Sequence, residues 1–280
     1  MVTEFANAKI NLYLDVVGIR EDGFHNIKSV MHSISLCDKL TIESVLSDKT
    51  EIEIVHDSLE LSNDKDNLIY KSALKYLTKY DLNARIKITL EKNIPIGAGL
   101  GGGSSDAAAT LRGLNRIFGL ADKDELLKLS CEIGSDVPFC LIGGTAMCEG
   151  RGEILTPLNT DLYHHFVVAI GDSRVSTPKA YRDLDERFNY NFANRSMNVP
   201  DFKTLYNVFE EVITIPEIDE IKEIMIKSGA EKTLMSGSGP SVFGIYENEE
   251  SARLAVESLQ KLGFRAYYAT SVEVSKVDSI

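Results

Sequence analysis

Apolar and polar residues alternate along several short stretches of the chain, and in other stretches the apolar residues recur every three or four positions. Alternation with a period of two is typical of strands that bury one face. It is clearest in Arg85-Ile-Lys-Ile-Thr-Leu-Glu91 and in the second half of Val30–Glu43. We predict strands at residues 4–17, about 30–55, 85–91, 165–170, 241–246 and 264–272.

Capping residues and glycines mark the ends of the predicted helices. The first helix follows Asp66-Asn67, and the second runs to Phe118 and is ended by Gly119. Asp122 and Glu125 form a variant of the capping box at the start of the third. The same reasoning predicts helices at about 201–213, 216–228 and 249–262, and a loop from 185 to 200.

The order of these elements indicates the fold class. Strands and helices alternate without a long series of parallel βα units, which favours an α+β architecture in two layers. A segment rich in glycine and small residues, 142–153, leads to a change of pattern near 155–165. We therefore predict two domains, residues 1–160 and 161–280.

Composition narrows the class of partner. The 280 residues carry a net charge of −12, which argues against nucleic acid or an anionic membrane as the main partner. No apolar run approaches the ~18–20 residues of a membrane span, and the first residues lack the features of a signal peptide. We therefore expect a cytoplasmic protein. Its four cysteines form no zinc-binding pattern and are expected to be reduced and mostly buried.

The most informative stretch is Lys92-Asn-Ile-Pro-Ile-Gly-Ala-Gly-Leu-Gly-Gly-Gly-Ser-Ser-Asp106, which lies between a predicted strand and a predicted helix. Its five glycines, at 97, 99, 101, 102 and 103, let the backbone approach a ligand closely. Ser104 and Ser105 stand where the helix should begin, and the free N–H groups of a helix N-terminus attract anions. The stretch therefore predicts a phosphate-binding loop.

Several kinds of glycine loop must be distinguished. Gly97, Gly99 and Gly102 satisfy the dinucleotide pattern G-x-G-x-x-G, but the acidic strand end about 20 residues later is replaced by the start of a helix. A Walker A loop would need a lysine where Gly103 stands, and the motifs of protein kinases are absent. A glycine-rich turn without a ligand would incur the conformational entropy cost of five glycines without a functional reason.

The remaining pattern, Pro-x-Gly-x-Gly-Leu-Gly-x-x-Ser-Ser, resembles the signature of the GHMP small-molecule kinases. Further stretches are similar to one branch of that family, and the match runs from about residue 6 to 272. These stretches are Ala8–Leu14, Asp22–His25, Gly134–Phe139 and Ser236–Ser241.

That branch uses ATP and magnesium to phosphorylate the 2-hydroxyl of 4-diphosphocytidyl-2-C-methyl-D-erythritol, in the non-mevalonate route to isoprenoids and terpenoids. The resemblance implies a first domain like domain 2 of ribosomal protein S5, a ferredoxin-like second domain and an active site in the cleft between them.

The resemblance implies that the glycine loop holds the ATP phosphates. The implied nucleotide-binding residues are Lys92, Pro95, Ile96, Gly97, Ala98, Gly99, Leu100, Gly101, Gly102, Gly103, Ser104 and Ser105. Either serine hydroxyl could reach a magnesium ion, although helix capping alone would also explain both serines. By itself, a lone lysine after a strand, such as Lys92, is more often solvated.

Two residues have implied catalytic roles. Asp136 is the expected general base, which would orient the acceptor hydroxyl and take its proton; its alternative role is to cap the short element that begins at Pro138. Lys9 would keep that carboxylate ionised and stabilise the phosphoryl group in transfer. Without the family context, Lys9 would be read as part of the polar face of a strand.

The resemblance also implies a substrate-binding set of Asn11, Phe24, His25, Asp136, Thr177, Tyr181 and Gly237. Asn11 shares a strand face with Lys9 because the two are separated by two positions. Phe24 and Tyr181 would stack on the cytosine while His25 hydrogen-bonds its edge. The family usually has tyrosine at position 24, so this chain keeps the aromatic face and loses a hydroxyl.

Two rival functions remain at this stage. One is another GHMP kinase, acting on mevalonate, homoserine or a sugar, which would not need the nucleobase site. The other is a non-catalytic nucleotide-binding regulator, for which Lys9 and Asp136 would be unnecessary. The partner is expected to be a small molecule, and both a monomer and a homodimer are compatible with the sequence.

Overall fold

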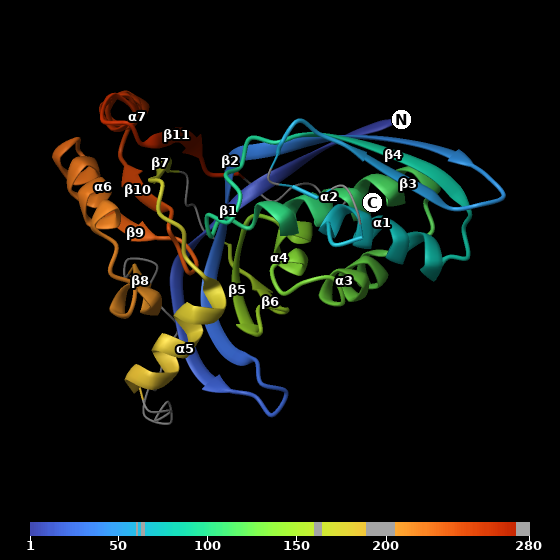
Figure 1. The fold of residues 1–280 in the computed structure, drawn as a ribbon, viewed down its shortest axis with the longest axis horizontal. Helices are drawn as coiled ribbons and strands as arrows, with labels where there is room; N and C mark the ends of the chain where they lie inside the picture. The colour runs from blue at the N-terminus through green and yellow to red at the C-terminus, as the bar shows by residue number, and fades with distance from the viewer. Residues whose placement is uncertain (60, 63–64, 160–163, 189–204, 273–280) are drawn as a thin grey trace.

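The computed structural model describes residues 1–59, 61–62, 65–159, 164–188 and 205–272, which form two sheets with helices packed against them (Figure 1). The first sheet has the strand order β3-β4-β2-β1-β8, and β5 and β6 extend it beside β2. Its strands are β1 (Val2–Ile19), β2 (His25–Leu46), β3 (Glu51–Val55), β4 (Ala84–Glu91), β5 (Thr145–Gly150), β6 (Ile154–Pro157) and β8 (Tyr206–Asn207).

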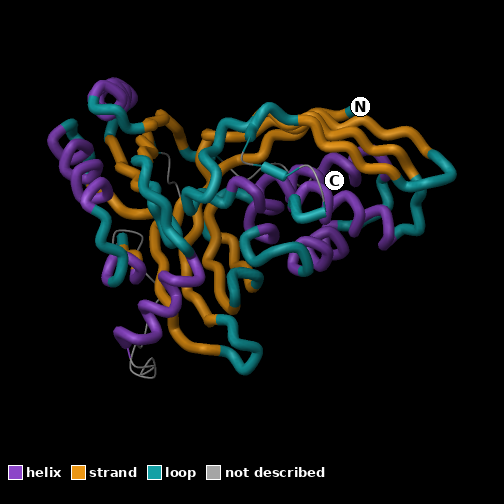
Figure 2. Tube along the Cα trace, viewed as in Figure 1, coloured by secondary structure: helices purple, strands orange, loops and turns teal. Residues whose placement is uncertain are grey.

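The long hairpin of β1 and β2 forms the centre of this sheet. The two strands pair along almost their whole length and are joined by a turn in which Gly23 has a φ of 82°. The second half of β2 pairs with β4 and the first half pairs with β5. On the side away from β1, the strand therefore has a different neighbour along each half. This hairpin extends beyond the helical layer toward the second half of the chain (Figure 2).

Helices cover one face of the first sheet (Figure 1). They are α1 (Leu68–Lys79), α2 (Gly102–Phe118), α3 (Lys123–Cys131) and α4 (Val137–Ile142). Leu111 and Leu114 of α2 are fully buried in a core with Ile42 and Ile88 of the strands. Gly113 lies between these leucines and brings the axis of α2 close to β2, because it has no side chain.

The second sheet is built from later residues in the order β11-β7-β10-β9, with every neighbouring pair antiparallel. Its strands are β7 (His165–Ile170), β9 (Lys232–Met235), β10 (Val242–Tyr246) and β11 (Arg265–Thr270), and its helices include α6 (Pro216–Lys227) and α7 (Glu249–Lys261). Numbered by their order along the chain, the strands of this sheet run 4-1-3-2. Helix α6 precedes β9 in the connection from β7, and α7 connects β10 to β11. This is the predicted ferredoxin-like β-α-β-β-α-β arrangement.

Several contacts join the first and second halves of the chain. β8 pairs in parallel with β1, although it comes from the second half of the chain. His32 of β2 is buried, and its ring nitrogens lie 2.7 Å from the Thr145 hydroxyl and 2.9 Å from that of Ser271. The predicted division at residue 160 falls between β6 and β7, within 160–163, which lie outside the described residues.

The α+β prediction is confirmed, and so are most strands and helices. The range 30–55 is not one strand, because polar residues 47–50 separate β2 from β3. Residues 185–188, predicted as loop, belong to helix α5 (Thr177–Phe188). A helix was predicted at 201–213, and residues 201–204 of that range lie outside the described residues. The rest of the range contains β8 and a 3-10 helix η2 (Val208–Glu211) instead of an α-helix.

β5 and β6 were not predicted. Thr145, Ala146, Met147 and Cys148 of β5 are all buried, because β5 lies between β2 and β6 in the sheet. A strand buried on both faces shows no alternation of polar and apolar residues, so periodicity does not reveal it.

All four cysteines are free thiols, but only Cys148 is fully buried, so the expectation that most are buried is wrong. Among the described residues, no helix is long and apolar enough to cross a membrane.

Replacing Gly113 by alanine should destabilise the protein by about 1–3 kcal/mol, because the new Cβ would lie 2.4 Å from Cδ1 of the buried Ile42. Gly103→Ala is the matched control in the same helix, since its nearest neighbour would be Leu68 Cδ1 at 3.6 Å. We expect that control to be neutral or more stable by about 0.4–1 kcal/mol. Urea unfolding measures both; equal midpoints for Gly113→Ala and the wild type would contradict the close packing.

Candidate active site

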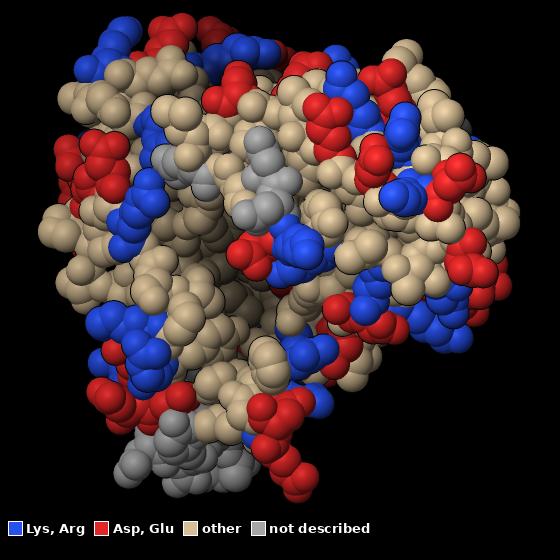
Figure 3. Space-filling view, turned by 45° about the vertical axis from the view of Figure 1, so that its right-hand side comes forward, with Lys and Arg blue, Asp and Glu red and all other residues tan. Residues whose placement is uncertain are grey.

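A cleft of about 700 Å³ lies between the two parts of the molecule, and residues from both parts line it. Figure 3 shows the surface hollowed between these parts, with acidic and basic side chains around the hollow. The predicted residues that line the cleft are Lys9, Asn11, Phe24, His25, Gly99, Gly101, Ser104, Asp136, Thr177, Tyr181 and Gly237. Segments that are distant in the sequence therefore meet in one cleft.

A second, smaller pocket of about 310 Å³ lies along the glycine loop. It is lined by Pro95–Ser104 together with Leu61, Leu68 and Lys92. Gly99, Gly101 and Ser104 line both the pocket and the cleft, so the loop lies between them. Of the predicted nucleotide-binding residues, only Ser105 lines neither of these two cavities.

The backbone of the loop is shaped for an anion. Gly97, Gly99 and Gly101 have φ values of 67°, 77° and 69°, which favour glycine. Gly101 is the N-cap of α2, and no side chain caps the helix. The first N–H groups of α2 are therefore left for a ligand, as expected for a phosphate site.

The glycine loop contacts the second glycine–serine loop, Ser236–Pro240, directly. The hydroxyl of Ser236 donates to the carbonyl of Gly99 at 3.1 Å, and the N–H of Gly237 donates to Asn11 Oδ1 at 3.0 Å. A Cβ on Gly99 would lie 2.2 Å from the carbonyl oxygen of Ser236. The two loops therefore approach this closely only because position 99 has no side chain.

Lys9 and Asn11 lie on β1 in the interior of the cleft. Lys9 is 4% exposed, and its Nζ donates to Asn11 Oδ1 at 2.7 Å. Irregularities in the β1–β2 pairing, between Asn7 and Lys9 and between Asn11 and Tyr13, flank both residues. Such irregularities in strand pairing often adjust the direction of side chains next to active sites.

Asp136 faces Lys9 across the cleft. Its carboxylate lies 3.7 Å from Lys9 Nζ, and its side chain is 29% exposed. Asp136 is the N-cap residue of α4, but its side chain makes no capping hydrogen bond. The capping alternative is therefore not supported, and the carboxylate remains available beside a buried ammonium group.

The two serines after the glycines point in different directions. Ser105 is buried, and its hydroxyl donates to the carbonyl of Asn7 at 2.5 Å and lies 3.2 Å from Cys140 Sγ. Its side chain therefore holds α2 against β1 and α4 instead of facing a cavity. Ser104 is the serine of this pair whose side chain could meet a ligand.

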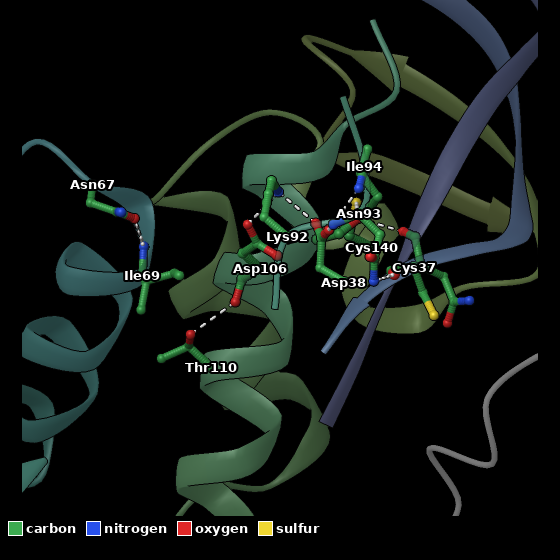
Figure 4. Close-up of polar contacts among 12 residues, drawn as sticks. Cys37, Asp38, Asn67, Ile69, Lys92, Asn93, Ile94, Asp106, Thr110 and Cys140 are labelled. Atoms are coloured by element: carbon green, nitrogen blue, oxygen red, sulfur yellow. Dashed lines mark hydrogen bonds and ion pairs between the residues drawn. The ribbon is translucent and has the colours of Figure 1, made fainter. Parts of the chain in front are cut away.

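Lys92 is not solvated, because its side chain is 6% exposed and lies between two carboxylates. Its Nζ donates to Asp38 Oδ2 at 2.5 Å and to Asp106 Oδ2 at 2.7 Å (Figure 4). The other oxygen of Asp38 accepts the N–H groups of Asn93 and Ile94. This group ties the start of the loop to β2 and α2.

Asp106 is the less satisfied carboxylate of this group. Its Oδ1 is buried and has no hydrogen-bond partner within the described part of the chain. Burial raises the pKa of Asp106 to about 7; the Lys92 ammonium lowers that pKa, and the Asp38 carboxylate raises it. If Gly102 carried a Cβ atom, that atom would lie 3.1 Å from Lys92 Nζ. The Lys92 ammonium group therefore lies directly beneath the start of α2.

Aromatic groups form the far end of the cleft. The rings of His25 and Tyr181 stack with their centroids 4.5 Å apart, and His25 Nε2 lies 2.7 Å from Asp185 Oδ1. Phe24 is 52% exposed, and its ring lies under the Arg151 guanidinium at 4.9 Å. Tyr181 thus stacks directly on the imidazole of His25, a contact that the sequence did not predict.

Six further residues line the cleft although no site role was predicted for them: Ser135, Arg151, Pro178, Arg182, Asp185 and Ser238. Asp185 follows Tyr181 by four residues, one helical turn, so predicting α5 would have placed it on the same face. Ser238 hydrogen-bonds Thr177 at 2.7 Å and joins its loop to the start of α5. Only the tertiary structure brings Arg151 to this cleft.

The chain is similar to a known family along most of its length. The family description "GHMP kinases N terminal domain" matches residues 67–144, and "GHMP kinases C terminal" matches residues 197–264. The chain is 41% identical over 273 residues to a 4-diphosphocytidyl-2-C-methyl-D-erythritol kinase of Macrococcus caseolyticus, covering 93% of this chain and 95% of that relative. It is 42% identical to the protein of the same name from Caldicellulosiruptor saccharolyticus, covering 91% of each.

Solved structures agree with these matches. A crystal structure of 4-(cytidine 5'-diphospho)-2C-methyl-D-erythritol kinase superposes with a TM-score of 0.79 at 34% identity, covering 96% of this chain and 98% of that one. A homoserine kinase from Cytophaga hutchinsonii has a TM-score of 0.69 at 20% identity, with 98% of this chain and 95% of that chain covered, and shares the fold.

Gly99→Ala should lower turnover by about 10²-fold, because the clash with Ser236 separates the two loops and misplaces the groups around Lys9. Gly119→Ala is the control for backbone strain: Gly119 has a φ of 67°, and its Cβ would meet nothing within 4 Å at the far end of α2. Both variants should lose about 1–2 kcal/mol from the left-handed backbone, but only Gly99→Ala should lose turnover per folded molecule. Equal turnover in the two would argue against loop contact as the constraint.

The raised pKa of Asp106 predicts a pH dependence of stability. The folded state holds this proton more tightly than the unfolded chain, where an aspartate has a pKa near 4. The stabilisation is complete below about pH 4 and is lost as the pH rises through about 7. Asp106→Asn should therefore lose less free energy of unfolding than the wild type between pH 4 and 7. Asp48→Asn, at an exposed loop position, should keep the wild-type slope; the same slope in Asp106→Asn would contradict the assignment.

Proposed function

The chain belongs to the GHMP kinase family, and we propose that it uses ATP to phosphorylate the 2-hydroxyl of 4-diphosphocytidyl-2-C-methyl-D-erythritol. This is a step of isoprenoid precursor synthesis by the non-mevalonate route. The observation that carries the proposal is the pairing of Lys9 with Asp136 at 3.7 Å in the cleft that the glycine loop borders. The two relatives at 41% and 42% identity, which have that activity in their names, support it.

The donor end of the site is built from backbone. The uncapped N–H groups at the start of α2 and the positive φ values of the glycines provide a cradle that fits phosphate oxygens. Lys92 lies behind that cradle and also lines the pocket along the glycine loop. Its positive charge therefore attracts phosphate both across the loop backbone and in the pocket. ATP supplies the phosphoryl group that is transferred.

Magnesium belongs to this proposal as the ion that accompanies ATP. No group of three or more His, Cys, Asp or Glu residues that could hold a metal is found among the described residues. Kinases commonly hold Mg²⁺ through phosphate oxygens and only one or two protein oxygens, so this arrangement fits. The Ser104 hydroxyl, which lines both cavities, is the ligand we assign to it.

The acceptor end supplies the proton chemistry. Asp136 accepts the proton of the acceptor hydroxyl as that oxygen attacks phosphorus, and general-base catalysis of this kind contributes roughly 10²–10⁴-fold. Lys9 offsets negative charge on the phosphoryl group in transfer and is held in place by Asn11. The N–H of Gly237 donates to Asn11. The second glycine–serine loop therefore helps to position Lys9 through Asn11, while the first loop holds the phosphates.

The aromatic end of the cleft gives the substrate its identity. Phe24, His25 and Tyr181 offer ring faces and an imidazole to a pyrimidine, and Asp185 orients that imidazole by accepting from Nε2. A kinase for mevalonate, homoserine or a simple sugar would have no use for this end. We propose a cytoplasmic enzyme that acts as a monomer or a homodimer.

Phosphorus NMR of the product tests the proposed reaction. The purified protein with ATP, magnesium and the cytidine diphosphate substrate should release ADP and form a phosphomonoester at the 2-position. A phosphate at any other position would overturn the substrate assignment. If ADP is released without consumption of the acceptor, or if no ADP is released, the alternative of a non-catalytic nucleotide-binding regulator would be favoured.

Lys9→Met and Asp136→Asn should each lower turnover by roughly 10²–10⁴-fold, because each removes a group that acts on the transferred phosphoryl or on the acceptor proton. ATP should still bind, since neither side chain belongs to the loop. Lys87→Met, on an exposed position of β4, and Asp48→Asn are the matched controls and should keep wild-type rates. Single-turnover assays with separate ATP titrations make the measurement; near-normal turnover in either site variant would remove that residue from the mechanism.

A further inference from the structure

We propose that Arg151 and Arg182 form the subsite for the diphosphate of the acceptor, an inference that rests on the function proposed above. Arg151 lies in the turn between β5 and β6, and Arg182 lies on α5. Both line the cleft, although they come from different halves of the chain. Neither was indicated by the sequence.

Arg182 is the cation of α5 that has no ion pair among the described residues. Tyr181 and Asp185 also line the cleft, so this part of α5 faces it. The other two cations of α5 are paired, Lys179 with Asp183 and Arg187 with Glu211, and Asp185 contacts His25. Glu186 also has no ion pair among the described residues, but it does not line the cleft. Arg182 is exposed and makes no hydrogen bond or ion pair with any residue that the structure describes. It is therefore a cation in the cleft with no counter-ion in the described part of the chain.

Arg151 lies beside the aromatic end of the cleft. Its guanidinium carbon is 4.9 Å from the centroid of the Phe24 ring, and its side chain is 30% exposed. Its one ion pair, among the described residues, is a long contact of 4.0 Å with Glu153. A guanidinium held against the nucleobase-binding ring is well placed for a phosphate joined to that nucleoside, and its planar donors match phosphate oxygens in pairs.

The charge balance of the cleft calls for such a subsite. The protein carries a net charge of −12, and Asp136 and Asp185 place two carboxylates in the cleft itself. The third cation that lines it, Lys9, already contacts Asn11 and Asp136. A diphosphate brings further negative charge and must lie between the nucleobase and the reacting alcohol, because it joins the two. Arg151 and Arg182 supply the positive charge that this middle section needs.

The test compares ligands that differ only in their phosphates. Cytidine, CMP and CDP are used as competitive inhibitors of the wild type and of Arg151→Ala, Arg182→Ala and Arg182→Lys. Each alanine variant should bind CDP about 10–100-fold more weakly, since hydrogen bonds to charged groups are worth about 1.5–3 kcal/mol. Cytidine should bind as it does to the wild type. Arg182→Lys should recover part of the CDP affinity, because it keeps the charge and loses the paired geometry.

Arg187→Ala is the matched control, since Arg187 is on the same helix and is paired with Glu211 outside the cleft. It should leave the affinities for cytidine and CDP unchanged. The KM for the acceptor should rise in Arg151→Ala and Arg182→Ala, while the KM for ATP stays constant.

Three results would overturn the inference. Equal losses for cytidine and CDP would show damage to the nucleobase end, and a rise only in the KM for ATP would assign the arginines to the donor. Unchanged CDP affinity in both alanine variants would mean that these arginines are solvated. Failure of the wild type itself to bind CDP or to consume the acceptor would instead overturn the proposed function, so the two failures are distinguishable.

Discussion

The active site depends on the close approach of two glycine-containing loops from opposite halves of the chain. Gly99 accepts from Ser236, and the N–H of Gly237 donates to Asn11, which in turn holds Lys9. A single methyl group at position 99 would lie 2.2 Å from a carbonyl oxygen. Since backbone atoms cannot yield as a long side chain can, this contact sets the distance between the halves and therefore the shape of the cleft.

Buried charge is the second organising feature. An acidic protein binds an anion by concentrating a few cations where the anion lies, and here these cations are held by named partners. Lys92 is fixed between Asp38 and Asp106 beneath the start of α2, and Lys9 is fixed by Asn11 beside Asp136. Such pairs stabilise the fold only modestly, because burial of each charge is costly. Their clearer effect is to place positive charge beside the loop and the reacting groups.

The contacts around α5 explain why substrate recognition was the least predictable part of the site. Tyr181 and Asp185 reach His25 on the β1–β2 hairpin, so the nucleobase end exists only where these two elements meet. The sequence around them is polar on average, and residues 185–188 of it were predicted as loop. Lys92 shows the same difficulty in another form: a lysine after a strand looks solvated until its two carboxylate partners, 54 and 14 residues away, are seen.

By itself, the sequence determined the elements whose causes are local and the motifs whose spacing is rigid. Period-two alternation revealed β4 and the second half of β2, glycines and caps marked the bounds of α2 and α3, and the glycine pattern identified the loop and the family. The tertiary structure alone decided which side chains face the cleft. Ser105 turns inward to Asn7 while Ser104 stays in the cavity, Asp136 leaves its helix uncapped, and Arg151 reaches Phe24. These outcomes depend on contacts between residues far apart in the chain, and neither periodicity nor propensity records such contacts.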